Sequence, residues 1–186
     1  MGSRGTASHE GKTGATNSPA HRRARGRRAS LKVRRVTING RRRVFEVTIS
    51  GNRRLNFPFA KLTVRPRPTD PIRRVYVDKE LGSEGFTYVL QSGKEGAVLV
   101  DHILDYNKDP DYLRDLLLYR LTVHAQGRIA KTPLAKREIV RRLGTSPTQL
   151  YRLLDQTNYT KTVDQMLRLL QALDCDVELV VRAKSA

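Results

Sequence analysis

Residues 134–173 read LAKREIVRRLGTSPTQLYRLLDQTNYTKTVDQMLRLLQAL and decide the fold of the C-terminal part of the chain. The pattern predicts a short helix that ends at Gly144, because glycine suits the left-handed residue that terminates many helices. Ser146 is predicted to cap the next helix. Thr162 and Gln165 have the spacing of a capping box at the start of a third helix. Two short helices joined by a tight turn and followed by a third form a helix-turn-helix motif.

This stretch resembles the helix-turn-helix domain of the Cro/repressor (XRE-like) class, which includes antitoxin-type autoregulators. The matching elements are Glu138-Ile139, Leu143-Gly144, Ser146, Arg152-Leu153-Leu154 and Leu167–Leu173. Two positions depart from the pattern. Ala135 stands where a Ser or Thr usually caps the first helix, and Val140 replaces the small residue at the helix crossing. The resemblance implies a transcriptional regulator that binds double-stranded DNA sequence-specifically, with residues 147–155 as the recognition helix in the major groove.

The resemblance also implies which side chains meet the DNA. Gln149 has the geometry to pair with adenine and Arg152 with guanine. The expected base contacts are Thr148, Gln149, Tyr151 and Arg152. The expected phosphate contacts are Ser146, Lys136, Asn158, Tyr159 and Lys161. The alternative is that these residues form the solvated face of a protein-binding helical domain.

Positive charge is unevenly distributed along the chain. The 186 residues include 36 Lys and Arg against 18 Asp and Glu, a net charge of +18. Residues 1–60 hold 15 basic and two acidic residues, and residues 131–161 hold seven basic and two acidic residues. Nucleic acid is the simplest partner for charge that coincides with such a motif.

The first 29 residues are rich in Gly, Ser, Thr, Ala and Arg and have almost no large apolar side chains. Such a composition predicts a flexible basic arm. Its arginines, Arg22, Arg23, Arg25, Arg27 and Arg28, would reach along phosphates or into a minor groove. A solubilising tail is the alternative.

From Ser30 the apolar residues alternate with period two, which predicts strands. Asn39-Gly40 is a favoured two-residue hairpin turn, and Gly51-Asn52 indicates a second turn. Residues 31–101 are therefore predicted to form one small, mostly antiparallel sheet. The segment FEVTISGNRRLNFPFAKL weakly resembles small β domains of uncharacterised bacterial proteins, a resemblance that implies no mechanism.

The predicted class is α+β, in four parts. A disordered basic arm (1–29) precedes a small β domain (30–104), a connecting helix (105–130) capped at Asp109-Pro110, and an all-helical helix-turn-helix domain (131–186) with a terminal strand from Cys175 to Val181. That strand would pair with the β domain or with a second copy. We expect a homodimer, because a two-fold pair doubles the length of DNA read.

Little in the sequence points to catalysis. Asp101, His102 and Asp105 are better explained by a strand-to-helix junction than by an acid–base or metal cluster. We therefore expect no enzyme activity, no cofactor and no metal site. Without a long apolar run or a signal core, a cytoplasmic, nucleoid-associated protein is expected.

A second hypothesis is a non-enzymatic adaptor. In it, both domains bind proteins, for example a toxin in a toxin–antitoxin complex or components of a mobile-element complex. The basic arm would then bind nucleic acid without sequence preference.

Overall fold

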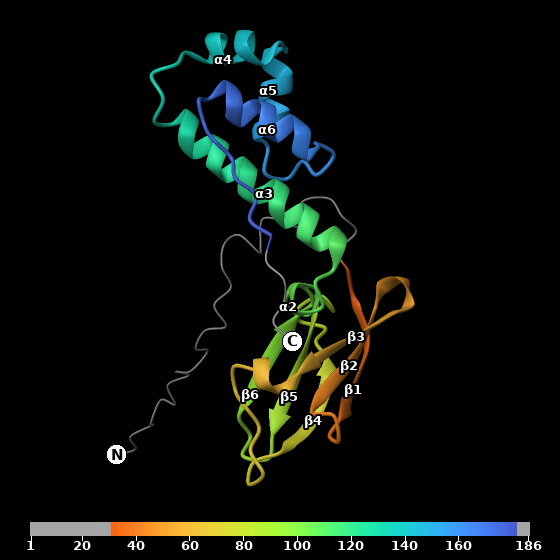
Figure 1. Ribbon diagram of the computed structural model, residues 1–186. Helices are drawn as coiled ribbons and strands as arrows, with labels where there is room; N and C mark the ends of the chain where they lie inside the picture. Colours follow the sequence, from red (N-terminus) through yellow and green to blue (C-terminus); the bar gives the residue numbers. More distant parts are fainter. Residues whose placement is uncertain (1–30, 182–186) are drawn as a thin grey trace, which may run out of the picture.

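The computed structural model describes residues 31–181, and it is mixed α+β. Its strands and helices follow one another in the chain as two blocks (Figure 1). The strands are β1 (Val33–Asn39), β2 (Val44–Ile49), β3 (Arg53–Pro58), β4 (Ile72–Val77), β5 (Gly85–Leu90) and β6 (Glu95–Leu99). The helices are α2 (Val100–Tyr106), α3 (Pro110–Ile129), α4 (Lys136–Leu143), α5 (Pro147–Leu154) and α6 (Val163–Ala172).

The strands form two three-stranded antiparallel sheets, in the orders β1-β2-β3 and β4-β5-β6. The sequence predicted a single sheet, and this prediction is wrong. Strand β3 ends at Pro58, and a 3-10 turn (Phe59–Lys61) and a proline-rich segment separate it from β4. The chain then starts a second meander, and the two sheets pack face to face. Phe45 of β2 lies 4.8 Å from Phe86 and 5.8 Å from Tyr88 of β5 between ring centroids.

The turns of the first sheet match the prediction in part. Gly51 and Asn52 form the second turn, both with positive φ. The first turn is longer than the predicted Asn39-Gly40 pair, because Asn39 pairs with Val44 and leaves residues 40–43 as the loop. The Asn39 side chain accepts a hydrogen bond from the backbone N–H of Arg42 at 3.0 Å, which stabilises this wider loop.

The predicted connecting helix, capped at Asp109-Pro110, is α3, and the short helix α2, which was not predicted, precedes it and is separated from it by residues 107–109. Asp109 caps α3 as predicted, accepting from the backbone N–H of Tyr112 at 3.0 Å. The Arg53 guanidinium also donates to the Asp109 carboxylate, and Asn107 donates to the backbone carbonyl of Asn56 at 2.9 Å. These contacts attach the start of α3 to β3.

Helix α3 contributes to two hydrophobic cores. Tyr112 and Leu116 pack with the strands and α2, whereas Leu118, Leu121 and Ala125 pack with α4, α5 and α6. Figure 1 shows the strands below α3 and helices α4–α6 around its other end. The helix is therefore a structural member of both halves and more than a connection between them.

The terminal strand predicted at Cys175–Val181 is absent from the structure, which shows no strand between residues 173 and 181. Leu179 and Val181 are 86% and 84% exposed. A strand requires a partner for its backbone hydrogen bonds, and no described segment pairs with this one. The predicted layout, one sheet followed by a helical domain with a terminal strand, is therefore not confirmed. No helix formed by residues 31–181 has the length and apolar character needed to cross a membrane.

Candidate nucleic-acid interface

Helices α4 and α5 are joined by the tight turn that the sequence predicted. Gly144 ends α4 in the left-handed conformation, with φ of 62° and ψ of 37°. The backbone N–H of Thr145 then bonds to the carbonyl of Val140 at 3.2 Å. Ser146 caps α5 by accepting from the backbone N–H of Gln149 at 3.2 Å. A residue with a Cβ would be strained at Gly144, so this glycine fixes the angle between the two helices.

A compact apolar core holds α5 against its neighbours. Ile139 of α4, Leu150 and Leu153 of α5, and Met166 and Leu169 of α6 are each at most 3% exposed. Thr162 and Gln165 form the predicted capping box at the start of α6. Because Leu150 and Leu153 fill the inner side of α5, its opposite side faces solvent.

The outer side of α5 carries the residues expected to contact bases. Thr148, Tyr151 and Arg152 are exposed, and Gln149 is half-buried. The Lys136 ammonium lies 5.4 Å from the centre of the Tyr151 ring, a cation–π distance. The helix therefore presents one long cation and several hydrogen-bonding groups on a single exposed surface.

The C-terminal end of α5 is held by side chains that bond to its last carbonyls. Asn158 donates to the carbonyl of Arg152 at 3.0 Å, and Gln126 of α3 donates to that of Leu154 at 2.8 Å. The Lys161 ammonium donates to the carbonyls of Leu153 at 2.9 Å and Asp155 at 2.7 Å. Carbonyls at a helix end have no partner within the helix, so these bonds complete it.

These bonds correct one of the predicted phosphate contacts, Lys161, and give Asn158 a structural role. Lys161 is only 4% exposed and also donates to the Thr122 hydroxyl of α3. Burial lowers the pKa of Lys161 to about 8. The side-chain oxygen of Asn158 accepts from the backbone and hydroxyl of Thr160. Lys161 faces inward and is not available to a phosphate, whereas Asn158 is half-buried and helps to position the end of α5 through its bond to the Arg152 carbonyl.

Tyr159 is also half-buried. Burial, reinforced by the nearby Asp115 carboxylate, raises the pKa of Tyr159 above its ordinary value. The hydroxyl is therefore neutral at physiological pH. Ser146 and Lys136 remain at the surface, where a phosphate contact requires them.

Ion pairs divide the basic residues of this region into two groups. Glu138 binds Arg141 at 2.6 Å and Arg142 at 3.1 Å, and Asp174 also binds Arg142 at 3.0 Å. Hydrogen bonds from the two arginines hold the pKa of Glu138 at about 2. Within residues 31–181, no ion pair is found for four exposed basic residues near α5, namely Lys131, Lys136, Arg137 and Arg152.

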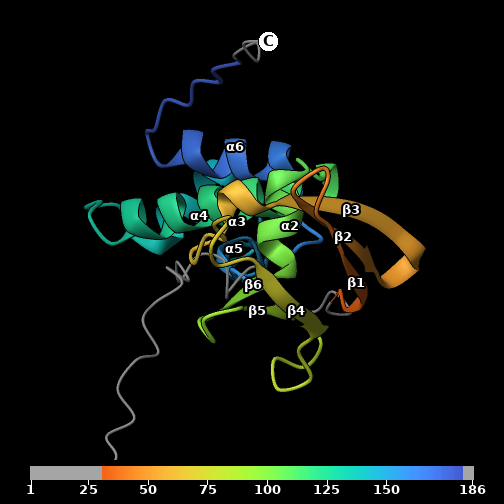
Figure 2. The same cartoon turned by 90° about the horizontal axis from the view of Figure 1, so that it is seen from below.

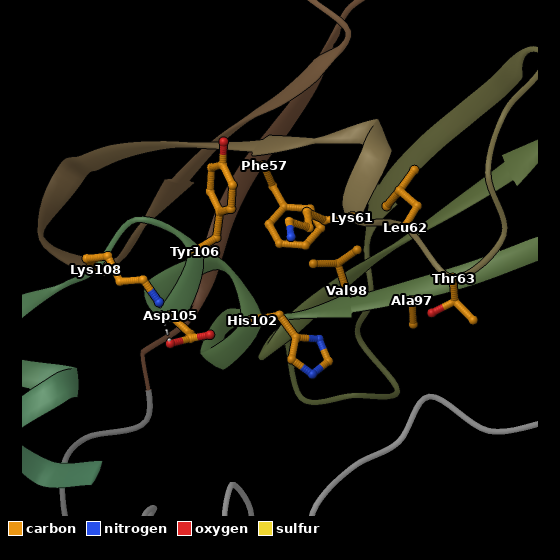
Figure 3. A pocket seen from close by; sticks show the side chains of 10 residues that line it. All are labelled: Phe57, Lys61, Leu62, Thr63, Ala97, Val98, His102, Asp105, Tyr106 and Lys108. Atoms are coloured by element: carbon orange, nitrogen blue, oxygen red, sulfur yellow. Dashed lines mark hydrogen bonds and ion pairs between the residues drawn. The ribbon is translucent and has the colours of Figure 1, made fainter. Parts of the chain in front are cut away.

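A separate cavity of about 500 Å³ lies between β3, β6 and α2 (Figure 3). His102 and Asp105 line it together with the apolar side chains of Phe57 and Val98. Asp105 forms an ion pair with Lys108 at 3.2 Å. In the described part of the chain, no group of three or more His, Cys, Asp or Glu is arranged to hold a metal ion.

Two further features of the structure were not predicted from the sequence. One is the inward role of Gln126, Asn158 and Lys161, which depends on contacts between distant segments. The other is a cluster of arginines on the first sheet, whose signal was the period-two spacing of polar residues in β1–β3. The predicted arm arginines, Arg22–Arg28, lie outside the described residues. Comparisons with models of protein families, with curated proteins and with solved structures found no match to this chain.

Proposed function

We propose that this protein binds double-stranded DNA sequence-specifically and acts as a transcriptional regulator, with α5 as its recognition helix. The observation that carries the proposal is how α5 is held in the fold and which of its sides is exposed. It is capped at both ends, packed on one side, and exposes Thr148, Tyr151 and Arg152 on the other. A rigid helix of this length is the element that enters a major groove in helix-turn-helix proteins.

Each exposed group has a role in this proposal. Arg152 would donate two hydrogen bonds to guanine, and Gln149 would pair with adenine through its amide. Thr148 and Tyr151 would contact a thymine methyl group or a phosphate. The backbone N–H of Thr148, in the first turn of α5, would bind one phosphate, because Pro147 has no N–H and the Gln149 N–H donates to Ser146. Lys131, Lys136 and Arg137, which form no ion pair within residues 31–181, would supply attraction to the backbone.

A homodimer fits this proposal, since one short helix reads few base pairs. The segment after α6 supports self-association, because Val177, Leu179, Val180 and Val181 are between 48% and 86% exposed. Exposed apolar residues in an extended segment favour pairing with another chain. The same segment is the observation that favours the adaptor function, in which it would bind a different protein.

Selection of binding sequences from a random duplex library tests the proposal. The full chain should enrich a defined motif, and Arg152→Ala should relax preference at one base pair, at a cost of about 1–3 kcal/mol. Arg168→Ala is the matched control, because Arg168 is exposed on α6 and paired with Asp164 at 3.0 Å. Enrichment of no motif by the unmodified chain would contradict sequence-specific binding.

A further inference from the structure

The outer face of the first sheet carries arginines that no other part of the described structure uses. Arg35 of β1 and Arg54 of β3 both pair in register with Thr48 of β2, so the three lie in one row across the sheet. Arg42 extends from the loop between β1 and β2. Together with Thr37 and Asn56, these residues line a shallow depression of about 360 Å³. We call Arg35, Arg42 and Arg54 the arginine face.

No acidic side chain within residues 31–181 forms an ion pair with the arginine face. Its depression contains one carboxylate, Glu46, which accepts a hydrogen bond from Asn39 at 2.7 Å. Across the described range 31–181, no ion pair is found for Arg35, Arg42 or Arg54, and all three are exposed. By contrast, Arg53, on the inner side of the same strand, binds the Asp109 cap. Like charges that line one depression repel one another, so the three arginines do not stabilise the fold through ion pairs within residues 31–181.

We propose that the arginine face binds the phosphate backbone of duplex DNA, as a second contact that does not depend on sequence. The inference rests on the proposed function for the identity of its partner. Guanidinium groups match phosphate oxygens in charge and in hydrogen-bond geometry. The hydroxyls of Thr37 and Thr48 and the amide of Asn56 add neutral donors of the kind that contact phosphates.

The composition of the face favours duplex over single strands. Single-stranded nucleic acid is usually bound through aromatic side chains on which bases stack. The residues that line the depression include no aromatic side chain. Neighbouring strands lie about 4.8 Å apart, so the backbones of Arg35 and Arg54 are about 10 Å apart. Two long side chains at that separation can reach different phosphates.

The arginine face is distinct from the surface of α5. In the view of Figure 2, β1–β3 lie on one side of the molecule and α4 lies on the other. Loss of the arginine face should therefore weaken binding to every duplex equally, whereas changes on α5 should alter the preferred sequence. This difference separates the present inference from the proposed function.

The test compares the full chain with the triple variant Arg35→Gln, Arg42→Gln, Arg54→Gln. Affinity is measured by fluorescence anisotropy for the selected duplex and for a scrambled duplex of equal length, over a range of salt. Each lost phosphate contact lowers the slope of log affinity against log salt by about 0.9. When salt rises from about 50 to about 200 mM, the full chain should therefore lose about 40-fold more affinity than the triple variant. This difference should be the same for both duplexes.

Matched variants make the result specific to this face. Arg73→Gln, Lys79→Gln, Lys94→Gln removes the same charge from exposed positions of the second sheet and its turns, and should leave the slope unchanged. Thr48→Glu places a carboxylate between Arg35 and Arg54 and should reproduce most of the loss without removing an arginine. An unchanged melting temperature shows that each variant is folded.

Four outcomes would overturn the inference: an unchanged slope in the triple variant, an equal fall in the control variant, tighter binding of a single strand than of a duplex, or competition by polyglutamate as strong as by duplex. If the unmodified chain does not distinguish the two duplexes, sequence-specific recognition fails. The slopes of the triple and control variants still decide the role of the arginine face.

Discussion

The helical region around α5 and the first sheet are both rich in basic residues, but they hold them in different ways. Around α5, Arg141 and Arg142 bind Glu138, and Lys161 is buried against the end of the helix. On the arginine face, three guanidinium groups have no acidic partner among the described residues. A cation that is already bonded contributes to the position of a helix, whereas an unpaired cation is available to an external anion.

This difference shows why net charge alone does not locate a binding surface. The region 131–161 has seven basic residues against two acidic ones, yet three of the seven are engaged within the protein. Lys131, Lys136, Arg137 and Arg152 remain for a partner. The first sheet has fewer motif-like features, but its residues Arg35, Arg42 and Arg54 form no ion pair within residues 31–181.

The largest expected effect concerns Lys161. Lys161→Met removes the donor to the carbonyls of Leu153 and Asp155 and should lower the free energy of unfolding by about 2–3 kcal/mol, because each buried acceptor left unpaired costs about 1–3 kcal/mol. Lys131→Met, at an exposed position without an ion pair, should change it by less than about 0.5 kcal/mol. Urea denaturation measures both. Equal effects would show that Lys161 is not a structural cation.

The lowered pKa of Lys161 predicts how the stability of the protein changes with pH. The pKa of Lys161 is about 8 in the folded protein and 10.5 as the ordinary value. The unfolded chain therefore binds more protons between these values, and the stability of the protein relative to Lys161→Met should rise as pH increases from 8 to 10.5. A difference that stays flat over this range would contradict the lowered pKa.

A further prediction compares two helix caps. Ser146→Ala and Thr162→Ala each remove a side-chain acceptor from the first turn of a helix, α5 and α6 respectively. Each should destabilise the protein by about 1 kcal/mol. Only Ser146→Ala should also weaken duplex binding, because it loosens the turn of α5 expected at the DNA. Affinity for DNA is measured by fluorescence anisotropy. Equal losses in the two variants would contradict a direct contact between α5 and the DNA.

Short-range features of the fold could be predicted from the sequence because their causes are local. The positive φ at Gly144, the Ser146 cap and the capping box at Thr162 each depend on residues within four positions of one another. The Asp109 cap belongs to the same class. Such motifs satisfy backbone groups that every helix end leaves free, so they follow from residue type and spacing.

Features that depend on distant segments could not be predicted. Whether β1–β6 form one sheet or two depends on which strands meet in space, and alternation along each strand is the same in both cases. Lys161 looks like a surface residue in the sequence, because its acceptors come together only in the fold, with Thr122 from α3 and with Leu153 and Asp155 from the end of α5. The apolar segment after α6 has the composition of a strand, but composition does not supply a partner strand.

The prediction with the smallest expected effect concerns a substitution that frees a basic side chain in the helical region. Glu138→Gln removes the carboxylate that binds Arg141 and Arg142. The melting temperature should not change measurably, because exposed ion pairs contribute little to stability. Duplex affinity at low salt should rise by a few-fold at most, with a slightly steeper salt dependence, because Arg141 becomes available while Arg142 stays bound to Asp174. Since the pKa of Glu138 is about 2, mild acid does not break its ion pair with Arg141, and a substitution is needed to test the prediction.

The control is Asp164→Asn, which frees Arg168 on α6 and should leave the affinity for duplex DNA unchanged. If both variants tighten binding equally, overall charge and not the location of free cations determines affinity, and the contrast between the two regions loses its meaning.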